Sequence, residues 1–178
     1  NTGERLRINP FFTDPGANLK RHISVLSDAL NDLLPVEALI GPKLREAVLS
    51  CYTEAGWNIE SGTYSADGPP VYPSMVDFNR HVARLCKQLP YGGELSQNYY
   101  GALTGRARIF IDDLYRDLFL HDGQQQLDDM LAKDTVIELD DLPPSEINMP
   151  AFVTSILLER LRAYCENQQR QSKDSERP

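Results

Sequence analysis

The stretch DTVIELDDLPPSEINMPAFVTSILLERLRAYCENQQ, residues 134–169, decides the fold class expected of this chain. A short apolar run at residues 136–139 is rich in β-branched side chains and lies between aspartates, which predicts a strand inside a sheet. The two prolines that follow end this strand because proline has no N–H to donate. Asn148 can then cap a helix that carries Pro150 in its first turn.

The helix expected after this turn is amphipathic. Its apolar residues recur at helical spacing and share one face: Phe152, Ile156, Leu157, Leu161 and Tyr164. A strand followed by an amphipathic helix is half of a parallel α/β layer, which needs neighbouring strands. The sequence offers one other candidate strand, at residues 4–12, where Leu6 and Ile8 alternate with charged residues before Asn9-Pro10 ends the run.

The region between these two candidate strands is predicted to be helical. Helices are expected at residues 18–34, 41–55, 74–89, 94–119 and 125–132. Gly56 is a plausible C-cap of the second helix, and Ser74 forms a capping-box-like pair with Asp77 at the start of the third. Gly101 and Gly105 weaken the fourth, and their spacing permits either the close approach of another helix or a kink.

These elements predict a mainly α fold, a helical bundle inserted between two short strands that belong to a larger α/β sheet. The expected organisation is an N-terminal strand and turn at residues 1–16, a helical bundle at 17–124, a strand with its helix at 125–169 and a polar tail at 170–178. Two short strands alone are not a stable sheet, so most of the sheet is expected outside this chain. The first residue, which is not Met, and the polar tail suggest a piece of a longer protein, although processing or a designed truncation would produce the same start.

The charge of the chain limits its expected partners. The formal net charge is −8, and a bare acidic domain is a poor nucleic-acid binder because phosphate binding depends on clusters of Lys and Arg. Acidic side chains dominate residues 112–146, where Arg116 and Lys133 are the only basic residues, and this segment is expected to be a solvated face. No segment has the pattern of a signal peptide or a membrane span, so we expect a cytoplasmic protein without a membrane partner.

The residues that could ligate a metal are scattered along the sequence. Cys51, Cys86 and Cys165 lie far apart near the apolar faces of predicted helices, which favours buried free thiols in a reducing compartment over disulfides or a metal cluster. The histidines fall in three different elements: His22, His81 and His121. Each is expected to be a surface or partly buried imidazole and not a zinc ligand. No nucleophile motif supports a small hydrolase.

The strongest resemblance to a catalytic pattern is VIELDD at residues 136–141. An apolar strand that ends in paired acids can hold magnesium and water in a nucleotide-binding ATPase. However, Glu138 interrupts the apolar run, and no G-x-x-x-x-G-K-[ST] loop occurs in the chain. We therefore interpret Asp140 and Asp141 as a polar strand exit, and we expect neither a catalytic residue nor a metal site in this chain.

Two other features are candidates for contacts with phosphate or a base. Arg106 and Arg108, in TGRARIF, could contact a phosphate or DNA, because an arginine beside a subunit boundary can act as a finger. A solvated helix face or a structural salt bridge is the favoured alternative. Residues 57–73 predict a long surface loop with three aromatic side chains: Trp57, Tyr64 and Tyr72. These could stack a base or dock a partner, but packing onto the bundle is the commoner outcome.

Four stretches, in this order, resemble the middle of a HerA/FtsK-type P-loop ATPase, a family of DNA translocases. RINPFF at residues 7–12 is similar to the family's strand that ends in Asn-Pro-Phe. PKLREAVLSCYTEAGW at residues 42–57 looks like its helix that runs to a Tyr and a Gly. YPSMVDFNRHV at residues 72–82 resembles its Pro-Thr/Ser helix start, and DTVIELDDL at residues 134–142 resembles the core strand before its Walker B strand.

The resemblance implies that the parent protein is a RecA-like ring ATPase, a HerA-like DNA translocase or helicase that is hexameric and acts on double-stranded DNA, alone or with a nuclease or defence partner. It implies ATP and magnesium as cofactors of the parent. The family's Walker A lysine and Walker B acids have no matching positions here, so no catalytic residue is carried over, and this chain alone is expected neither to hydrolyse nor firmly to bind ATP. The competing interpretation is a free-standing helical protein-interaction module without enzymatic activity, which leaves the two candidate strands unexplained.

Overall fold

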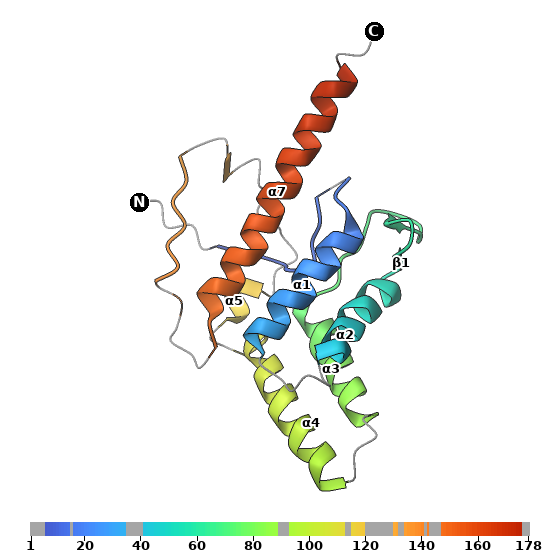
Figure 1. Ribbon diagram of the computed structural model, residues 1–178, viewed down its shortest axis with the longest axis vertical. Coiled ribbons are helices and arrows are strands. Elements are labelled where there is room, and N and C mark those ends of the chain that lie inside the picture. The colour runs from blue at the N-terminus through green and yellow to red at the C-terminus, as the bar shows by residue number, and fades with distance from the viewer. Residues whose placement is uncertain are drawn as a thin grey trace.

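The structure is a computed structural model that describes residues 6–14, 16–34, 41–88, 93–112, 115–119, 130–131, 134–140, 142 and 147–175. Within these residues the predicted mainly α fold class is confirmed (Figure 1). The elements are α1 (Leu19–Leu33), α2 (Gly41–Glu54), β1 (Trp57–Asn58), β2 (Thr63–Tyr64), α3 (Met75–Lys87), α4 (Gly93–Ala107), the 3₁₀-helix η1 (Arg108–Phe110), α5 (Arg116–Phe119) and α7 (Met149–Ser175).

Asparagine side chains set the first residues of α1 and α7. The side-chain oxygen of Asn18 accepts a hydrogen bond from the N–H of Arg21 at 3.0 Å. The side-chain oxygen of Asn148 accepts one from the N–H of Ala151 at 3.2 Å. Each bond satisfies one of the N–H groups that a first helical turn leaves without a partner. The cap predicted at Asn148 is therefore confirmed.

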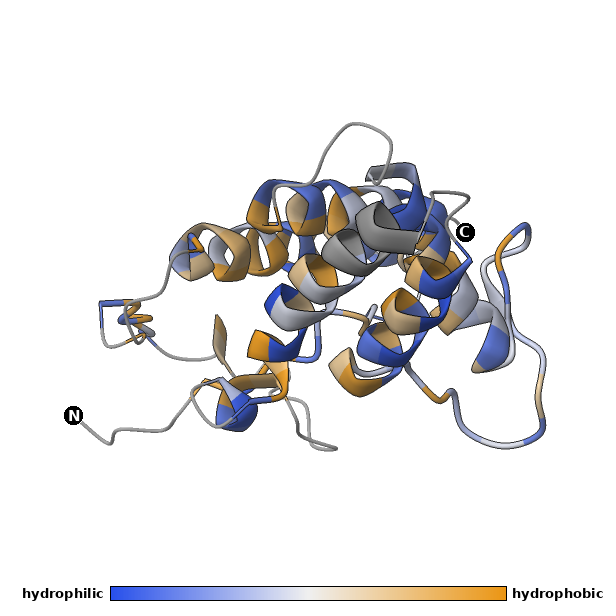
Figure 2. Cartoon of the chain, turned by 90° about the horizontal axis from the view of Figure 1, so that it is seen from below, coloured by the Kyte–Doolittle hydropathy of each residue, from blue (hydrophilic) through white to orange (hydrophobic). Residues whose placement is uncertain are grey.

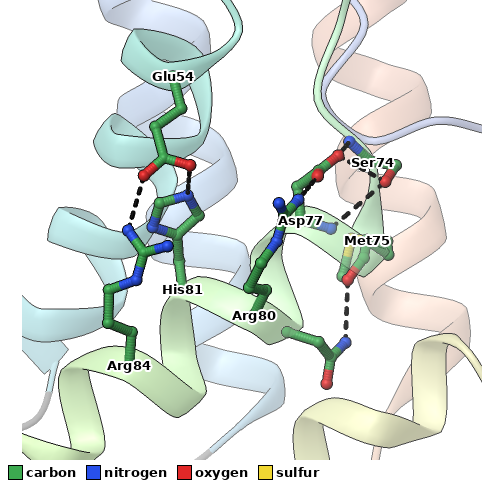
Figure 3. Close-up of polar contacts among 8 residues, drawn as sticks. Glu54, Ser74, Met75, Asp77, Arg80, His81 and Arg84 are labelled. Atoms are coloured by element: carbon green, nitrogen blue, oxygen red, sulfur yellow. Dashed lines mark hydrogen bonds and ion pairs between the residues drawn. The ribbon is translucent and has the colours of Figure 1, made fainter.

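The start of α3 is the capping box that the sequence predicts. Ser74 Oγ accepts a hydrogen bond from the N–H of Asp77 at 3.3 Å, and Asp77 Oδ2 accepts one from the N–H of Ser74 at 2.9 Å (Figure 3). Arg80, one turn along the helix, forms an ion pair with the Asp77 carboxylate. The reciprocal bonds satisfy two backbone donors with side chains three residues apart.

The helices pack through their apolar faces around one core. α2 packs against both α1 and α3, α3 also packs against α4, and α1 packs against α7. Figure 2 shows hydrophobic and hydrophilic residues alternating along these helices, which is the pattern of amphipathic helices. The largest fully buried side chains include four phenylalanines and two tyrosines: Phe11, Phe78, Phe110, Phe119, Tyr52 and Tyr115. Aromatic side chains from elements far apart in the sequence therefore make much of the core.

Neither of the two predicted strands is a strand within the described chain. Residues 6–9 have no regular structure, and the N–H of Ile8 donates to the carbonyl of Leu118 at 2.8 Å. Residues 134–139 have no helix and no strand partner, and the side chain of Val136 is 85% exposed where a buried strand was expected. A strand is completed only by the backbone groups of a neighbouring strand, and the described part of the chain brings none to either segment.

The segment predicted as a long loop contains a short hairpin that the sequence analysis did not predict. β1 and β2 pair antiparallel, with Trp57 opposite Tyr64. Gly56 enters the hairpin with a φ of 97°, and Gly62 precedes β2 with a φ of 70°. Positive φ is available to glycine without steric cost, so these two glycines allow the tight reversal of the chain.

The single helix predicted at residues 94–119 is instead three pieces, α4, η1 and α5. The side-chain amide of Asn79, on α3, donates to the carbonyl of Ala107 at 2.8 Å and so satisfies a carbonyl at the end of α4. α4 continues through Gly101 and Gly105, and a Cβ placed on either glycine would meet nothing within 4 Å. No other described segment therefore approaches α4 closely at these glycines.

The predicted polar tail at residues 170–178 is helical as far as Ser175, because α7 continues through it. Figure 1 shows this end of α7 projecting beyond the other helices. Ion pairs between Arg162 and both Glu159 and Glu166 support the polar part of the helix at spacings of three and four residues. Leu161, predicted on the buried face, is 37% exposed. Of the predicted helix at 125–132, the described residues 130–131 are helical.

Candidate functional site

Several long-range contacts surround residues 8–14, which form an irregular segment before α1. We call these residues and the side chains in contact with them the N-terminal junction. The side-chain amide of Asn9 donates to the carbonyl of Pro73 at 2.8 Å, and its side-chain oxygen accepts from the N–H of Phe11 at 3.0 Å. Asn9 therefore shapes its own turn and ties it to the segment that precedes α3.

Phe11 is the centre of the junction. Its ring is completely buried and lies 5.7 Å from the ring of Tyr52 on α2 and 6.3 Å from the ring of Phe78 on α3. The hydroxyl of Tyr52 donates a hydrogen bond to the carbonyl of Phe11. Burial raises the pKa of Tyr52 well above its ordinary value, so the phenol stays a protonated donor at neutral pH.

The aromatic loop packs onto the same segment. The ring of Tyr72 lies 4.8 Å from the ring of Phe12 and 5.0 Å from the ring of Trp57, and its hydroxyl donates to the carbonyl of Thr13 at 2.8 Å. The ring of Tyr64 packs edge-on against Trp57 at 5.5 Å. The packing of these loop aromatics onto the bundle, which we expected as the commoner outcome, is confirmed, and their faces are engaged within the protein.

α7 contributes a buried cation to the junction. The guanidinium of Arg160 lies 5.1 Å from the centre of the Phe12 ring, and its Nη2 lies 3.8 Å from Oδ1 of Asp14. Burial lowers the pKa of Arg160, an effect that Asp14 opposes. A buried charge is tolerated when an opposite charge lies beside it, and the aromatic face adds a cation–π contact. Arg160 thus links α7 to the N-terminal segment.

His22, on α1, completes the junction. Its Nε2 lies 3.0 Å from the carbonyl of Pro10, and its ring is edge-on to Tyr52 at 6.4 Å. Burial lowers the pKa of His22 to about 4, so the imidazole is neutral at pH 7 and can donate from Nε2. The sequence analysis predicted a surface or partly buried imidazole for His22, and that prediction is wrong because the residue is fully buried against the N-terminal segment.

A second polar cluster joins α2 to α3 (Figure 3). One oxygen of Glu54 lies 3.1 Å from Nε2 of His81, and the other accepts a hydrogen bond from Arg84 at 2.7 Å. The hydrogen bond from Arg84 is the main reason that the pKa of Glu54 is lowered. His81 is fully buried, which corrects the prediction of a surface or partly buried imidazole. Both oxygens of the Glu54 carboxylate have a partner on α3, so this side chain links α2 to α3.

The cysteines do not form a reactive site. Cys51 and Cys86 are buried and free, as predicted, and burial raises the pKa of Cys51 to about 12. A thiol with so high a pKa is a poor nucleophile at neutral pH. Cys165 is free but exposed on α7, so the prediction that it is buried is wrong. Among the described residues no group of three potential ligands could hold a metal ion.

The candidate phosphate contacts, Arg106 and Arg108, are members of neither cluster. Arg106, in the last turn of α4, and Arg108, in η1, are exposed, and Arg108 lies 3.9 Å from Asp112. This arrangement matches the solvated or salt-bridged alternative. Asp140 is exposed, while Asp141 and His121 lie outside the described residues. No described helix has both the length and the apolar character that crossing a membrane requires.

Comparison of this chain with protein families, with curated proteins and with solved structures gives no match. The functional argument therefore depends on the sequence motifs and on the contacts described above. The sequence analysis did not predict the N-terminal junction. A signal that could have indicated it is the number of aromatic residues in three stretches: RINPFF, the 57–73 loop and the end of α2.

Proposed function

We propose that this chain is the helical insertion of a HerA-like ring ATPase that translocates or processes double-stranded DNA. One observation carries the proposal. Three of the four stretches that resemble this family, residues 7–12, 42–57 and 72–82, meet at the N-terminal junction, although the sequence separates them by tens of residues. A set of motifs that packs together supports a common origin more strongly than the same motifs scattered over a surface.

The contacts join the residues by which each stretch is recognised. Phe11, from the Asn-Pro-Phe segment, packs on Tyr52, the tyrosine of the second stretch, and on Phe78 of the third. Asn9 binds the carbonyl of Pro73, the proline that precedes α3. These motif residues pack against one another. They can therefore occur together in a chain that has no nucleotide-binding loop.

In this proposal the two segments predicted as strands join the helical body to a RecA-like sheet of the parent protein. Residues 6–9 and 134–139 lie at either end of the bundle sequence, where an insertion leaves and rejoins a sheet. ATP, magnesium and the hexameric ring belong to the parent, and the insertion shapes the ring or contacts DNA or a partner protein. Arg106 and Arg108, both exposed, remain its candidate phosphate contacts.

The test is to read the source gene on both sides of this segment and then to assay its product. We expect a G-x-x-x-x-G-K-[ST] loop upstream of residue 1 and an apolar strand ending in paired acids downstream of residue 178. We also expect ATP hydrolysis that double-stranded DNA stimulates. A start codon immediately before residue 1 and a stop codon after residue 178 would refute the proposal.

One observation favours a second candidate, a free-standing helical interaction module without enzymatic activity. The described helices enclose a core rich in fully buried aromatic residues without help from any large sheet. Such a body can fold by itself. The gene reading separates the two candidates, because only the first requires flanking nucleotide-binding motifs.

A further inference from the structure

Residues 65–71 form a loop whose two ends are both tied to the start of β1. Every residue of this loop is exposed. At the first end, the N–H and the hydroxyl of Ser65 both donate to the carbonyl of Gly56, at 2.9 Å and 2.7 Å. At the other end, the carbonyl of Val71 accepts a hydrogen bond from Nε1 of Trp57 at 2.7 Å. The loop is therefore held at its base and open at its tip.

The tip of this loop places an aspartate directly before a glycine. Asp67 and Gly68 precede two prolines, and Gly68 has a φ of 101°. A Cβ built on Gly68 would meet nothing within 4 Å. Within the described chain, residues 66–70 make no backbone hydrogen bond. The backbone nitrogen of Gly68 is thus open to the side chain of Asp67, and no described contact holds the two apart.

From this arrangement we infer that Asp67 and Gly68 are a self-modification site, at which the chain closes a succinimide ring and reopens it as isoaspartate. The backbone nitrogen of Gly68 forms a bond to Cγ of the Asp67 carboxylic acid. The hydroxyl of the acid and the hydrogen of the N–H leave together as water. A second water molecule then adds to one of the two ring carbonyls and breaks its bond to the nitrogen. Addition at Cγ restores aspartate, whereas addition at the main-chain carbonyl leaves the chain running through the side chain, as isoaspartate.

Both the glycine and its position in a loop favour this reaction. Glycine has no Cβ, so the backbone on either side of it approaches a neighbouring group without steric cost. Asp28 provides the contrast, because it is also exposed but lies within α1, before Ala29. The N–H of Ala29 is held in the hydrogen-bonded ladder of the helix, which keeps its nitrogen from attacking the carboxyl group. Exposure alone therefore does not make a modification site of an aspartate in this chain.

The modified loop has a defined class of partner. Isoaspartate adds one carbon atom to the backbone between the anchors at Ser65 and Val71, and it exposes a free α-carboxylate at the tip of the loop. Protein carboxyl methyltransferases that use S-adenosylmethionine act on this group. The loop is therefore expected to become a substrate of such an enzyme as the protein ages, without any added reagent other than water.

The test ages the 178-residue chain in warm, mildly acidic buffer, once folded and once unfolded in urea. Isoaspartate is located by electron-transfer mass spectrometry of peptides and is counted with an isoaspartyl methyltransferase and radiolabelled S-adenosylmethionine. At Asp67 the rate in the folded chain should lie within about tenfold of the rate in urea, because opening an exposed loop costs little free energy. Asp28 should react only in urea. A folded chain in which Asp67 reacts more slowly than this limit would overturn the inference.

Two substitutions at the same position show whether ring closure is responsible. Asp67→Glu keeps the charge and the glycine but requires a larger ring, so it should remove the modification. Asp67→Asn closes the same ring with loss of ammonia, which leaves more readily, so it should form isoaspartate faster than the unmodified chain. If Asp67→Asn reacts in urea but not in the folded chain, the loop conformation prevents ring closure and the inference is wrong. The other Asp-Gly pair, at residues 122–123, lies outside the described residues, and its peptide is measured separately.

None of these results depends on the proposed function. Isoaspartate at Asp67 in a chain whose source gene lacks nucleotide-binding motifs would support the modification site and reject the ATPase. Flanking nucleotide-binding motifs together with an unreactive Asp67 would do the reverse.

Discussion

The hydrogen bond between Tyr52 and the carbonyl of Phe11 gives the sharpest test of the N-terminal junction. Tyr52→Phe removes the phenol oxygen and keeps the ring, so the packing against Phe11, His22 and Trp57 is retained. Both Tyr52 and Phe11 are completely buried, and water does not replace the lost donor. The free energy of unfolding should therefore fall by about 1–3 kcal/mol, which is the cost of leaving a buried carbonyl without its partner.

The matched control is Tyr64→Phe. Tyr64 also packs edge-on against Trp57, but it is half-buried, and its hydroxyl makes no hydrogen bond to any described residue. Its loss should change the free energy of unfolding by about 0.5 kcal/mol or less. Thermal and urea unfolding followed by circular dichroism measure both variants. In a chain of this size each kcal/mol shifts the melting temperature by about 2–4 °C. Equal stabilities of the two variants would refute the junction as a source of stability.

Tyr52→Phe should also change how the stability of the fold depends on pH above pH 10. Because the pKa of Tyr52 is raised in the folded state, its proton stabilises the fold fully below the ordinary tyrosine value of 10.0, and this stabilisation is lost as the pH rises above that value. The unmodified protein should therefore lose stability steeply above pH 10, and Tyr52→Phe should flatten this alkaline limb. A purely steric effect of the substitution would leave the slope unchanged.

Three further perturbations test other side chains of the structure. The pKa of Glu54 is lowered, so its stabilising effect is present above the ordinary value of 4.5 and is lost as the pH falls through the lower folded value. Glu54→Gln should therefore flatten the acid limb of a stability curve, and an unchanged acid limb would contradict this. Arg160→Met removes the buried cation beside the half-buried Asp14 and should lower the free energy of unfolding in urea by up to about 3–5 kcal/mol, whereas the exposed control Arg108→Met should lower it by less than about 1 kcal/mol. In the native protein at pH 8, iodoacetamide should alkylate Cys165 and spare the two buried cysteines, and mass spectrometry of peptides would contradict this if all three reacted equally.

The helix starts were predictable because their causes are local. The Ser74–Asp77 capping box and the cap at Asn148 depend on side chains that bond backbone groups three residues away. Such bonds form wherever the chain turns into a helix, whatever surrounds it. The end of α4 was not predictable, because the carbonyl of Ala107 is bound by Asn79 from another helix.

The expected strands also show the difference between local and tertiary causes. Residues 134–139 have the composition of a strand, but a strand exists only where a second backbone satisfies its N–H and C=O groups. Similarly, periodicity placed Leu161 on the buried face of α7, yet the neighbours that α7 meets leave it exposed. Periodicity predicts that a helix has an apolar side, whereas tertiary packing decides how much of that side is covered.

By itself, the sequence determined that the chain is mainly helical and where most of its helices begin, because the hydrogen bonds and side-chain spacings responsible lie within a few residues of one another. Only the tertiary structure brought Asn9, Phe11, Tyr52 and Arg160 to one junction. These contacts span from about 40 to about 150 residues of sequence, and no local pattern encodes which distant side chain fills a given space. The burial of His22 has the same origin, since its neutral imidazole is set by the carbonyl and rings that the fold places around it.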